Sequence, residues 1–244
     1  EHLGIRLADK VMTVNGICAA RLQSRHPARQ VAVIPNAPDA RTFPRLDPRQ
    51  RVGGAIRIGY HGTVAKRFGV STLVAAVAEL HRGGLPLALE IWGGGDDLDE
   101  VRSLASQLGI GAVTTLHGQV RVDVLVEGLK GIDLSVVPYE ADAYMAIAYS
   151  TKAFELAQMG IPMVVSDLPG IREQFSADAA LFVPAGDPGS LAVAMRQLAT
   201  DPGKAIQQAR QAQLEVKRFD WDLLSAQYVS ELAQIAQGVG GARP

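Results

Sequence analysis

A lysine and a glutamate three residues apart, Lys152 and Glu155, mark the segment of this chain that is best suited to chemistry. They follow Thr151 at the start of a predicted helix that ends at Gly160. Side chains three apart share a helix face, and a helix N-terminus favours anions. This arrangement suits a ligand with both phosphate and hydroxyl groups, such as a nucleotide sugar. The residues alone leave a second interpretation open, a surface ion pair that contributes only a few tenths of a kcal/mol.

A loop with two adjacent cations follows the predicted strand 56–60. Gly62 lets the backbone approach a ligand closely, and Lys66 and Arg67 stand at the start of a predicted helix, as a clamp for a diphosphate would. A polar loop with solvated charges is the alternative. His61, taken alone, is typical of a hydrogen-bonded structural residue.

Two further loops contain glycine and follow strands. Gly93 and Gly94 open one of them, which is similar to a phosphate-binding loop but lacks the complete GxGxxG fingerprint of dinucleotide sites. The other runs from His117 to Gln119 and Val120, where exposed backbone amides can bind a base. A tight turn that caps a helix explains the first loop equally well, and a structural turn is the simpler explanation of the second.

The long polar loop 139–149, which contains Glu140, comes directly before the helix of Lys152 and Glu155. Its length and polarity are typical of a binding loop. A carboxylate can accept two hydrogen bonds from vicinal hydroxyls, so Glu155 can hold a ribose while Lys152 neutralises phosphate charge.

Several classes of protein are disfavoured. The chain has no GxSxG, HExxH or GxxxxGK[ST] motif, so a serine hydrolase, a zinc protease and a P-loop enzyme are not expected. Asp96 and Asp97 are explained as helix caps, and no metal site is expected. The formal net charge of -1 gives no broad field for nucleic acid. The single cysteine, Cys18, excludes an internal disulfide, and we expect it to be a buried thiol.

Short apolar strands alternate with helices along the chain. We predict strands over 10–15, 31–35, 56–60, 87–92, 113–116, 134–138, 163–165 and 181–183. We predict helices over 16–24, 69–82, 98–108, 122–130, 151–159, 190–200 (capped by Ser190), 204–218 and 223–237. This alternation predicts an α/β fold with a doubly wound parallel sheet, in which ligands bind outside the carboxyl ends of the strands.

In this order, the four loops resemble the C-terminal domain of a GT-B glycosyltransferase of family 4, the retaining group 1 type. The most specific part runs from Thr151-Lys152 through Glu155 and Gly160 to Val165. Supporting parts are His61-Gly62-Thr63 with Arg67 and Gly69, and the loops of Gly93 and Gly118.

The resemblance implies a transferase that binds a nucleoside diphosphate sugar. By position, Arg67, Lys66 and Lys152 would contact the diphosphate, Glu155 the ribose, and the backbone at 119–120 the base. The loop 140–149 would face the sugar. The implied catalytic residues are Arg67, Lys152 and Glu155, and the implied donor-binding residues are Gly62, Thr63, Lys66, Gly93, Gly94, Gln119, Val120, Glu140 and Thr151.

The resemblance also implies a domain organisation. Residues 1–37 would be the tail of an N-terminal acceptor domain and 38–54 a linker. Residues 55–220 would be the Rossmann-like donor domain, and 221–244 a helix that crosses back. Neither a metal nor a cofactor is expected. The expected partners are a nucleotide sugar, an unknown acceptor and the absent acceptor domain, without nucleic acid. The expected location is the cytoplasm, with the inner face of the membrane as an alternative.

One departure from the family pattern keeps other functions open. Many members carry a second glutamate eight positions before the ribose glutamate, and Ile147 stands there in this chain, with Glu140 or Asp142 as candidate substitutes. A nucleotide-sugar-binding or scaffolding module without activity is therefore the alternative, and this chain alone is expected to turn over little. A third idea, an NAD-dependent Rossmann enzyme, is disfavoured by the incomplete glycine fingerprint.

Overall fold

The computed structural model describes residues 2–49 and 53–239. The chain divides into two compact units, one formed by Glu1–Pro38 with Lys217–Pro244 and the other by Asp39–Val216. All the candidate site residues belong to the larger unit, which is described first.

A six-stranded sheet forms the centre of the larger unit, and all its strand pairs are parallel. Its strands are β3 (Ile56–His61), β4 (Leu87–Trp92), β5 (Thr114–Gly118), β6 (Leu134–Val137), β7 (Met163–Ser166) and β8 (Leu181–Val183). The strand order is β5-β4-β3-β6-β7-β8, so the chain winds outward from β3 in one direction and from β6 in the other. The predicted doubly wound parallel sheet is confirmed, and the order reverses between β3 and β6.

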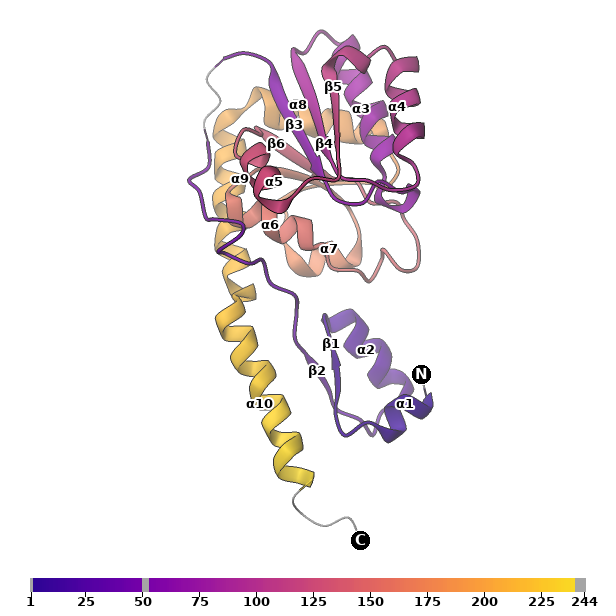
Figure 1. Cartoon of the computed structure of the whole chain (residues 1–244), viewed down its shortest axis with the longest axis vertical. Coiled ribbons are helices and arrows are strands. Elements are labelled where there is room, and N and C mark those ends of the chain that lie inside the picture. The colour runs from indigo at the N-terminus through magenta and orange to yellow at the C-terminus, as the bar shows by residue number, and fades with distance from the viewer. Residues whose placement is uncertain (1, 50–52, 240–244) are drawn as a thin grey trace. The chain divides into compact units, whose positions relative to one another are not determined.

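Helices cover both faces of this sheet, with α3 and α4 on one side of β3–β5 and α5 and α6 on the other (Figure 1). The helices of this unit are α3 (Val70–Arg82), α4 (Leu98–Gln107), α5 (Val122–Leu129), α6 (Thr151–Met159), α7 (Pro169–Gln174), α8 (Pro188–Thr200) and α9 (Pro202–Glu215). Short 3₁₀ turns cover Lys66–Phe68 and Gly111–Val113.

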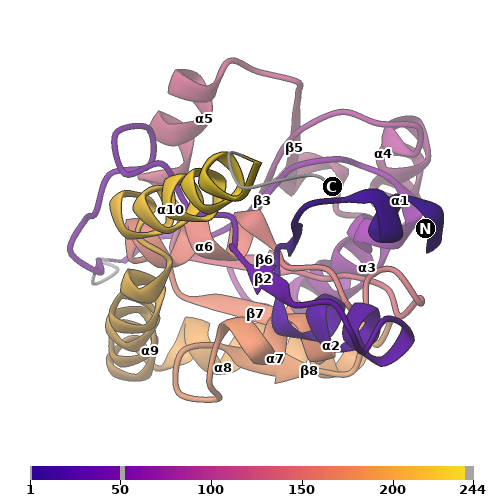
Figure 2. The same cartoon turned by 90° about the horizontal axis from the view of Figure 1, so that it is seen from below.

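The main core lies between the sheet and the layer of α3, α4 and α8. The predicted apolar face of α3 is buried, namely Val70, Leu73, Val74, Val77 and Leu80. It packs against α8, which lies beside β8 (Figure 2) and buries Leu191, Met195 and Leu198. Burial of each large aliphatic side chain stabilises the folded state by about 1.5–3 kcal/mol. The layer as a whole therefore keeps the helices fixed against the sheet whose strand ends carry the site.

The smaller unit contains α1 (His2–Leu7), β1 (Val11–Thr13), α2 (Gly16–Arg25), β2 (Val31–Val33) and α10 (Trp221–Val239). β1 and β2 pair in parallel, and Lys10 forms an ion pair with Glu231 at 2.5 Å. Asn15 caps α2 by accepting a hydrogen bond from the Cys18 amide at 2.7 Å. Cys18 itself is only half-buried, so the prediction of a buried thiol was wrong.

The segment 39–49 has neither a helix nor a strand, although its residues make specific contacts. Phe43 is buried, and the Leu46 carbonyl accepts a hydrogen bond from Gln213 Nε2 at 2.7 Å. A Cβ atom on Gly160, which ends α6 with a φ of +69°, would lie 2.7 Å from the same carbonyl oxygen. This segment is therefore packed onto the end of α6.

The predicted elements are present, with ends that differ by a few residues. β3 and β5 run further than predicted, so His61 and His117 lie in strands rather than in loops. The helices at 2–7 and 169–174 were not predicted, because both are short and neither has a complete apolar face.

Two predicted helix caps were wrong. The side chain that caps α8 is Asp187, which accepts a hydrogen bond from the Ser190 amide at 3.1 Å. Pro188 is the first residue of that helix, because proline needs no amide partner there, and Ser190 lies within the first turn. Asp97 occupies the cap position of α4, but its side chain accepts no hydrogen bond from the helix.

None of the helices described over 2–49 and 53–239 combines the length and the hydrophobicity that crossing a membrane requires.

Candidate functional site

Three of the loops join at the carboxyl ends of β3, β4 and β5. The Gly62 amide donates to the Trp92 carbonyl at 2.9 Å, and the Gly93 amide donates to the Gly118 carbonyl at 2.8 Å. The Val64 amide donates to the Gly94 carbonyl at 2.9 Å. The parallel hydrogen-bond pattern thus continues past the strand ends, so these loops form one continuous surface.

Backbone packing explains the glycine at position 93. Its φ is +145°, and a Cβ atom there would lie 1.8 Å from the Gly62 carbonyl oxygen. The close approach of the two loops therefore explains the glycine at position 93 without any contact to a ligand. Gly94 differs, because a Cβ atom there would meet only the Cβ of Gln119, at 3.9 Å. Gly94 and Gln119, both predicted to bind the donor, thus lie next to each other.

Lys152 is buried beneath the first of these loops. The side chain is on the first turn of α6 and the residue is 6% exposed. Its Nζ donates to the Tyr60 hydroxyl at 3.0 Å, and that hydroxyl donates to the Thr63 carbonyl at 2.6 Å. A Cβ atom on Gly62 would lie 3.0 Å from Nζ. The absence of a side chain at position 62 leaves the loop free to lie over the ammonium group.

Aromatic rings surround the Lys152 amine. The ring centres of Tyr60, Tyr139 and Phe68 lie 4.1, 5.1 and 5.3 Å from Nζ. Burial lowers the pKa of Lys152 to about 7, although the negative charge of Glu155 opposes part of this shift. The ring faces offset only part of the cost of burying the charged amine. An anion bound above Lys152 would therefore stabilise its protonated form.

Glu155 pairs with His61 rather than with Lys152. The distance from His61 Nε2 to Glu155 Oε2 is 2.7 Å, and the Glu155 side chain is 21% exposed. Among the ion pairs of the described residues, none joins Lys152 to Glu155. Lys152 and Glu155 both reach the end of β3, where Lys152 bonds to Tyr60 and Glu155 to His61. The alternative of a surface ion pair between them is therefore wrong.

Arg67 extends towards the long loop 139–149. Its Nη2 lies 3.5 Å from Asp142 Oδ2, its guanidinium lies 5.2 Å from the centre of the Tyr144 ring, and its side chain is 49% exposed. The Arg67 carbonyl accepts a hydrogen bond from the Glu140 amide at 2.9 Å. Hydrogen bonds from the amides of Met145 and Tyr144, together with the Arg67 charge, hold the pKa of Asp142 below its usual value. The loop after β3 and the loop after β6 are thus linked.

The Glu140 side chain is turned to the start of α3. Its Oε1 accepts a hydrogen bond from Thr72 Oγ1 at 2.6 Å, and its Oε2 lies 2.7 Å from the position of a Cβ atom on Gly186. A contact from Glu140 to a donor sugar therefore stays a prediction. Of the remaining predicted residues, Thr63, Lys66 and Gln119 are exposed and Val120 is half-buried, and Thr151 is exposed at the first position of α6.

A buried glutamine that sequence reasoning missed holds the start of α6. Gln174 Oε1 accepts from the Ser150 amide at 2.7 Å, and its Nε2 donates to the Ser150 carbonyl at 3.0 Å. Ser150 in turn caps α6 by accepting from the Ala153 amide at 3.2 Å. Because α7 was not predicted, nothing in the sequence linked Gln174 to this helix start. Gln174 thus positions Lys152 and Glu155 indirectly.

Gln174→Leu is expected to destabilise the chain by about 2–4 kcal/mol, because it leaves two buried backbone groups of Ser150 without these partners. Gln174→Glu keeps the acceptor for the Ser150 amide and is expected to cost less. Chemical denaturation of both variants measures the difference. Equal stability of the leucine variant and the parent would contradict this assignment.

Tyr60 and Tyr139 belong to the site although the sequence did not single them out, and His61, expected to be a hydrogen-bonded structural residue, belongs to it through its hydrogen bond to Glu155. They lie at the ends of β3 and just after β6, which are neighbours in the sheet but are separated by two strands along the chain. The sequence does show an aromatic residue at the end of each of these strands. Only the pairing of β3 with β6 reveals that the two aromatic residues lie close together.

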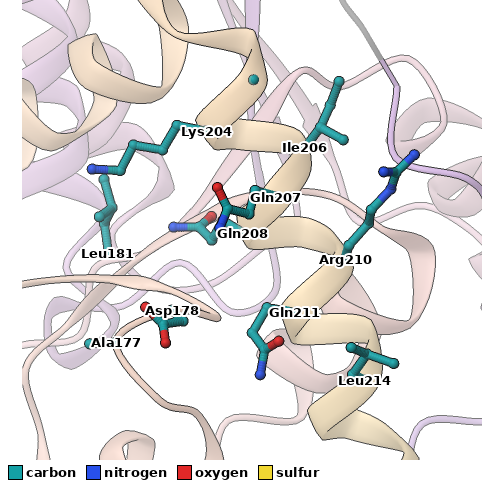
Figure 3. Close-up of a pocket in the computed structure, with 11 residues that line it drawn as sticks. Ala177, Asp178, Leu181, Lys204, Ile206, Gln207, Gln208, Arg210, Gln211 and Leu214 are labelled. Atoms are coloured by element: carbon teal, nitrogen blue, oxygen red, sulfur yellow. The ribbon is translucent and has the colours of Figure 1, made fainter.

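A separate pocket lies beside α9 and contains none of the predicted site residues (Figure 3). Lys204, Gln207 and Gln208 are among its lining residues. Gln208 Oε1 accepts from the Met163 amide at 2.9 Å, and its buried Nε2 has no partner among the described residues. Among residues 2–49 and 53–239, no group of three or more His, Cys, Asp or Glu side chains could hold a metal ion.

Comparison with known proteins identifies relatives of this unit. The family model described as "Glycosyl transferases group 1" matches residues 55–201. The chain is 27% identical over 198 residues to glycogen synthase of Mycobacterium tuberculosis, covering 80% of this chain and 46% of that protein. It is 28% identical over 227 residues to phosphatidyl-myo-inositol mannosyltransferase of Mycolicibacterium smegmatis, covering 91% and 56%.

Solved structures share the fold. Sucrose-phosphate synthase from Thermosynechococcus elongatus superposes with a TM-score of 0.79 at 22% identity, covering 96% of this chain and 60% of that one. Anabaena HepE, solved with UDP and glucose, gives a TM-score of 0.79 at 19% identity, covering 96% and 65%. The chain spans about half the length of the curated relatives it matches.

Proposed function

The chain belongs to the group 1 glycosyl transferases, and from this premise we propose that its site at the ends of β3 and β6 binds a nucleoside diphosphate sugar as the donor for glycosyl transfer. The observation that carries the proposal is the buried Lys152 amine under Gly62, with Arg67 and Glu155 on the adjoining loops. The order of the strands reverses at this point, where doubly wound sheets bind their ligands.

Each side chain has a distinct role in this proposal. Transfer breaks the bond between the anomeric carbon and the diphosphate oxygen, a new bond forms from that carbon to the oxygen of an acceptor hydroxyl, and the proton of that hydroxyl leaves with the departing diphosphate. Negative charge then builds on the departing diphosphate, and Lys152 and Arg67 stabilise it from fixed positions. Glu155 accepts hydrogen bonds from the ribose hydroxyls. The backbone beside Gln119 and Val120 contacts the base.

The finer features of the reaction rest on the resemblance of the motifs. We propose that transfer is of the family 4 type and retains the anomeric configuration. We also propose that cationic side chains, rather than a metal, compensate the diphosphate charge. HepE was solved with UDP and glucose, which supports a nucleotide sugar as the donor class. Ile147 supplies no carboxylate at the position of the second family glutamate, so we assign sugar contacts to the loop 140–149 as a whole.

Equilibrium titration tests the proposal directly. UDP, GDP and ADP, each with a corresponding sugar nucleotide, are titrated into the chain with and without EDTA. We expect one base to bind best, with unchanged affinity in EDTA. Glu155→Gln is expected to weaken that binding about tenfold, because it removes the charged acceptor for the ribose hydroxyls.

Glu79→Gln, on the far end of α3, serves as the control for loss of one carboxylate and is expected to bind like the parent. If none of the nucleotides binds at millimolar concentration, or if Glu155→Gln binds like the parent, the proposed function is wrong.

A further inference from the structure

Within the described residues, His117 and His61 each pair with a glutamate, and the two pairs differ in one respect. His117 Nε2 lies 2.6 Å from Glu90 Oε2, and His61 Nε2 lies 2.7 Å from Glu155 Oε2. Glu90 uses its other oxygen as well, because Oε1 accepts from Arg57 Nη2 at 2.8 Å. Both oxygens of Glu90 are therefore occupied by protein groups, as expected of a structural carboxylate.

Glu155 has only one oxygen occupied. The hydrogen bond to His61 takes Oε2, and within the described residues Oε1 accepts no hydrogen bond from the protein. The side chain is 21% exposed, so it is not sealed in the core. A carboxylate with one fixed and one open oxygen is suited to accept hydrogen bonds from a ligand.

His61 is itself held rigidly. It is the last residue of β3, where it aligns with Trp92 of β4, and its side chain is 5% exposed. Its Nδ1 is buried without a partner among the described residues, so Nε2 makes the hydrogen bond that orients the ring. Because a carboxylate oxygen can only accept, Nε2 carries the proton in this pair.

We propose that His61 is a positioning residue for recognition of the ribose: it fixes the Glu155 carboxylate through Oε2 and thereby presents Oε1 to the vicinal hydroxyls of the nucleotide. This inference rests on the proposed function, in which Glu155 accepts from those hydroxyls. A flexible glutamate loses rotamer freedom when it binds a ligand, and a side chain that is already fixed loses less. His61 thus contributes to affinity without touching the ligand.

The test compares each nucleoside diphosphate with its 2′,3′-dideoxy analogue, using UDP, GDP or ADP according to which binds the parent best. The ratio of the two affinities measures hydroxyl recognition within one protein, so a general loss of folding cancels. His61→Leu is expected to lower this ratio about tenfold and to leave the affinity for the dideoxy analogue unchanged. His61→Gln, whose amide nitrogen can replace Nε2, is expected to restore most of the ratio.

Two comparisons separate the possible failures. Glu155→Gln should lower the ratio even in the presence of His61, and if it does not, the ribose role in the proposed function is wrong. If Glu155→Gln lowers the ratio and His61→Leu does not, or if His61→Leu weakens both ligands equally, the positioning role is wrong. His81→Leu removes a histidine from the exposed end of α3 and is expected to bind both ligands like the parent.

Discussion

Replacement of Lys152 by methionine is expected to weaken binding of the nucleoside diphosphate by about 10- to 100-fold while leaving the fold as stable as the parent or more stable. The loss follows from removing the amine that lies under Gly62. The stability follows from the surroundings, because methionine packs well against the rings of Tyr60, Phe68 and Tyr139 and needs no counter-charge. Titration calorimetry and thermal unfolding of the same preparation measure both quantities.

The same variant should change how stability depends on pH. The pKa of Lys152 is about 7 in the folded chain, below the value of 10.5 for an ordinary lysine. Between these two values the unfolded chain binds more protons than the folded chain, so the burial penalty is complete below pH 7 and is relieved as the pH rises towards 10.5. The parent should therefore gain stability over this range relative to Lys152→Met. A variant that binds the diphosphate normally, or that unfolds at much lower temperature, would contradict the role given to Lys152.

Gly93→Ala is expected to destabilise the chain by roughly 3 kcal/mol or more, the largest loss predicted from a single methyl group. The added Cβ would lie 1.8 Å from the Gly62 carbonyl oxygen, and the backbone at this residue has a φ of +145°. Relief of the collision must separate the loops after β3 and β4. Binding of the diphosphate should fall as well, because Gly62 lies over Lys152.

Gly109→Ala is the matched control for Gly93→Ala. Its φ is +76°, but a Cβ atom there has nothing within 4 Å. The Gly109→Ala variant should lose only about 1–2 kcal/mol of stability, from the strained backbone, and keep its affinity for the nucleotide. Chemical denaturation of both variants separates the backbone cost from the collision. Equal losses in the two variants would mean that the loops do not depend on the close approach at Gly93.

Much of the fold could be predicted from local patterns. The apolar strand 134–138 and the face of α3 could each be recognised within ten or fifteen residues, because their burial sets a local period. The positions of Lys152 and Glu155 on one helix could be predicted for the same reason. What the sequence did not contain is the order of the strands, which places Tyr60 of β3 beside the residues that follow β6.

The partners of the predicted side chains depend on that order. The partner of Glu155 could not be read from its own helix, because it is His61, which lies on a strand almost a hundred positions earlier in the chain. Gln174 belongs to a six-residue helix that has no period of its own. Gly93 was assigned equally to a ligand or to a turn, and only the three-dimensional contact with Gly62 accounts for it.

The most direct test of the convergence of these loops is a crystal structure of the chain with its preferred nucleoside diphosphate. We expect the diphosphate above Gly62, with phosphate oxygens in hydrogen-bond contact with Lys152 and Arg67 and the ribose hydroxyls on Glu155. A nucleotide bound elsewhere on the chain, or bound at these loops with its phosphates out of contact with both cations, would contradict it.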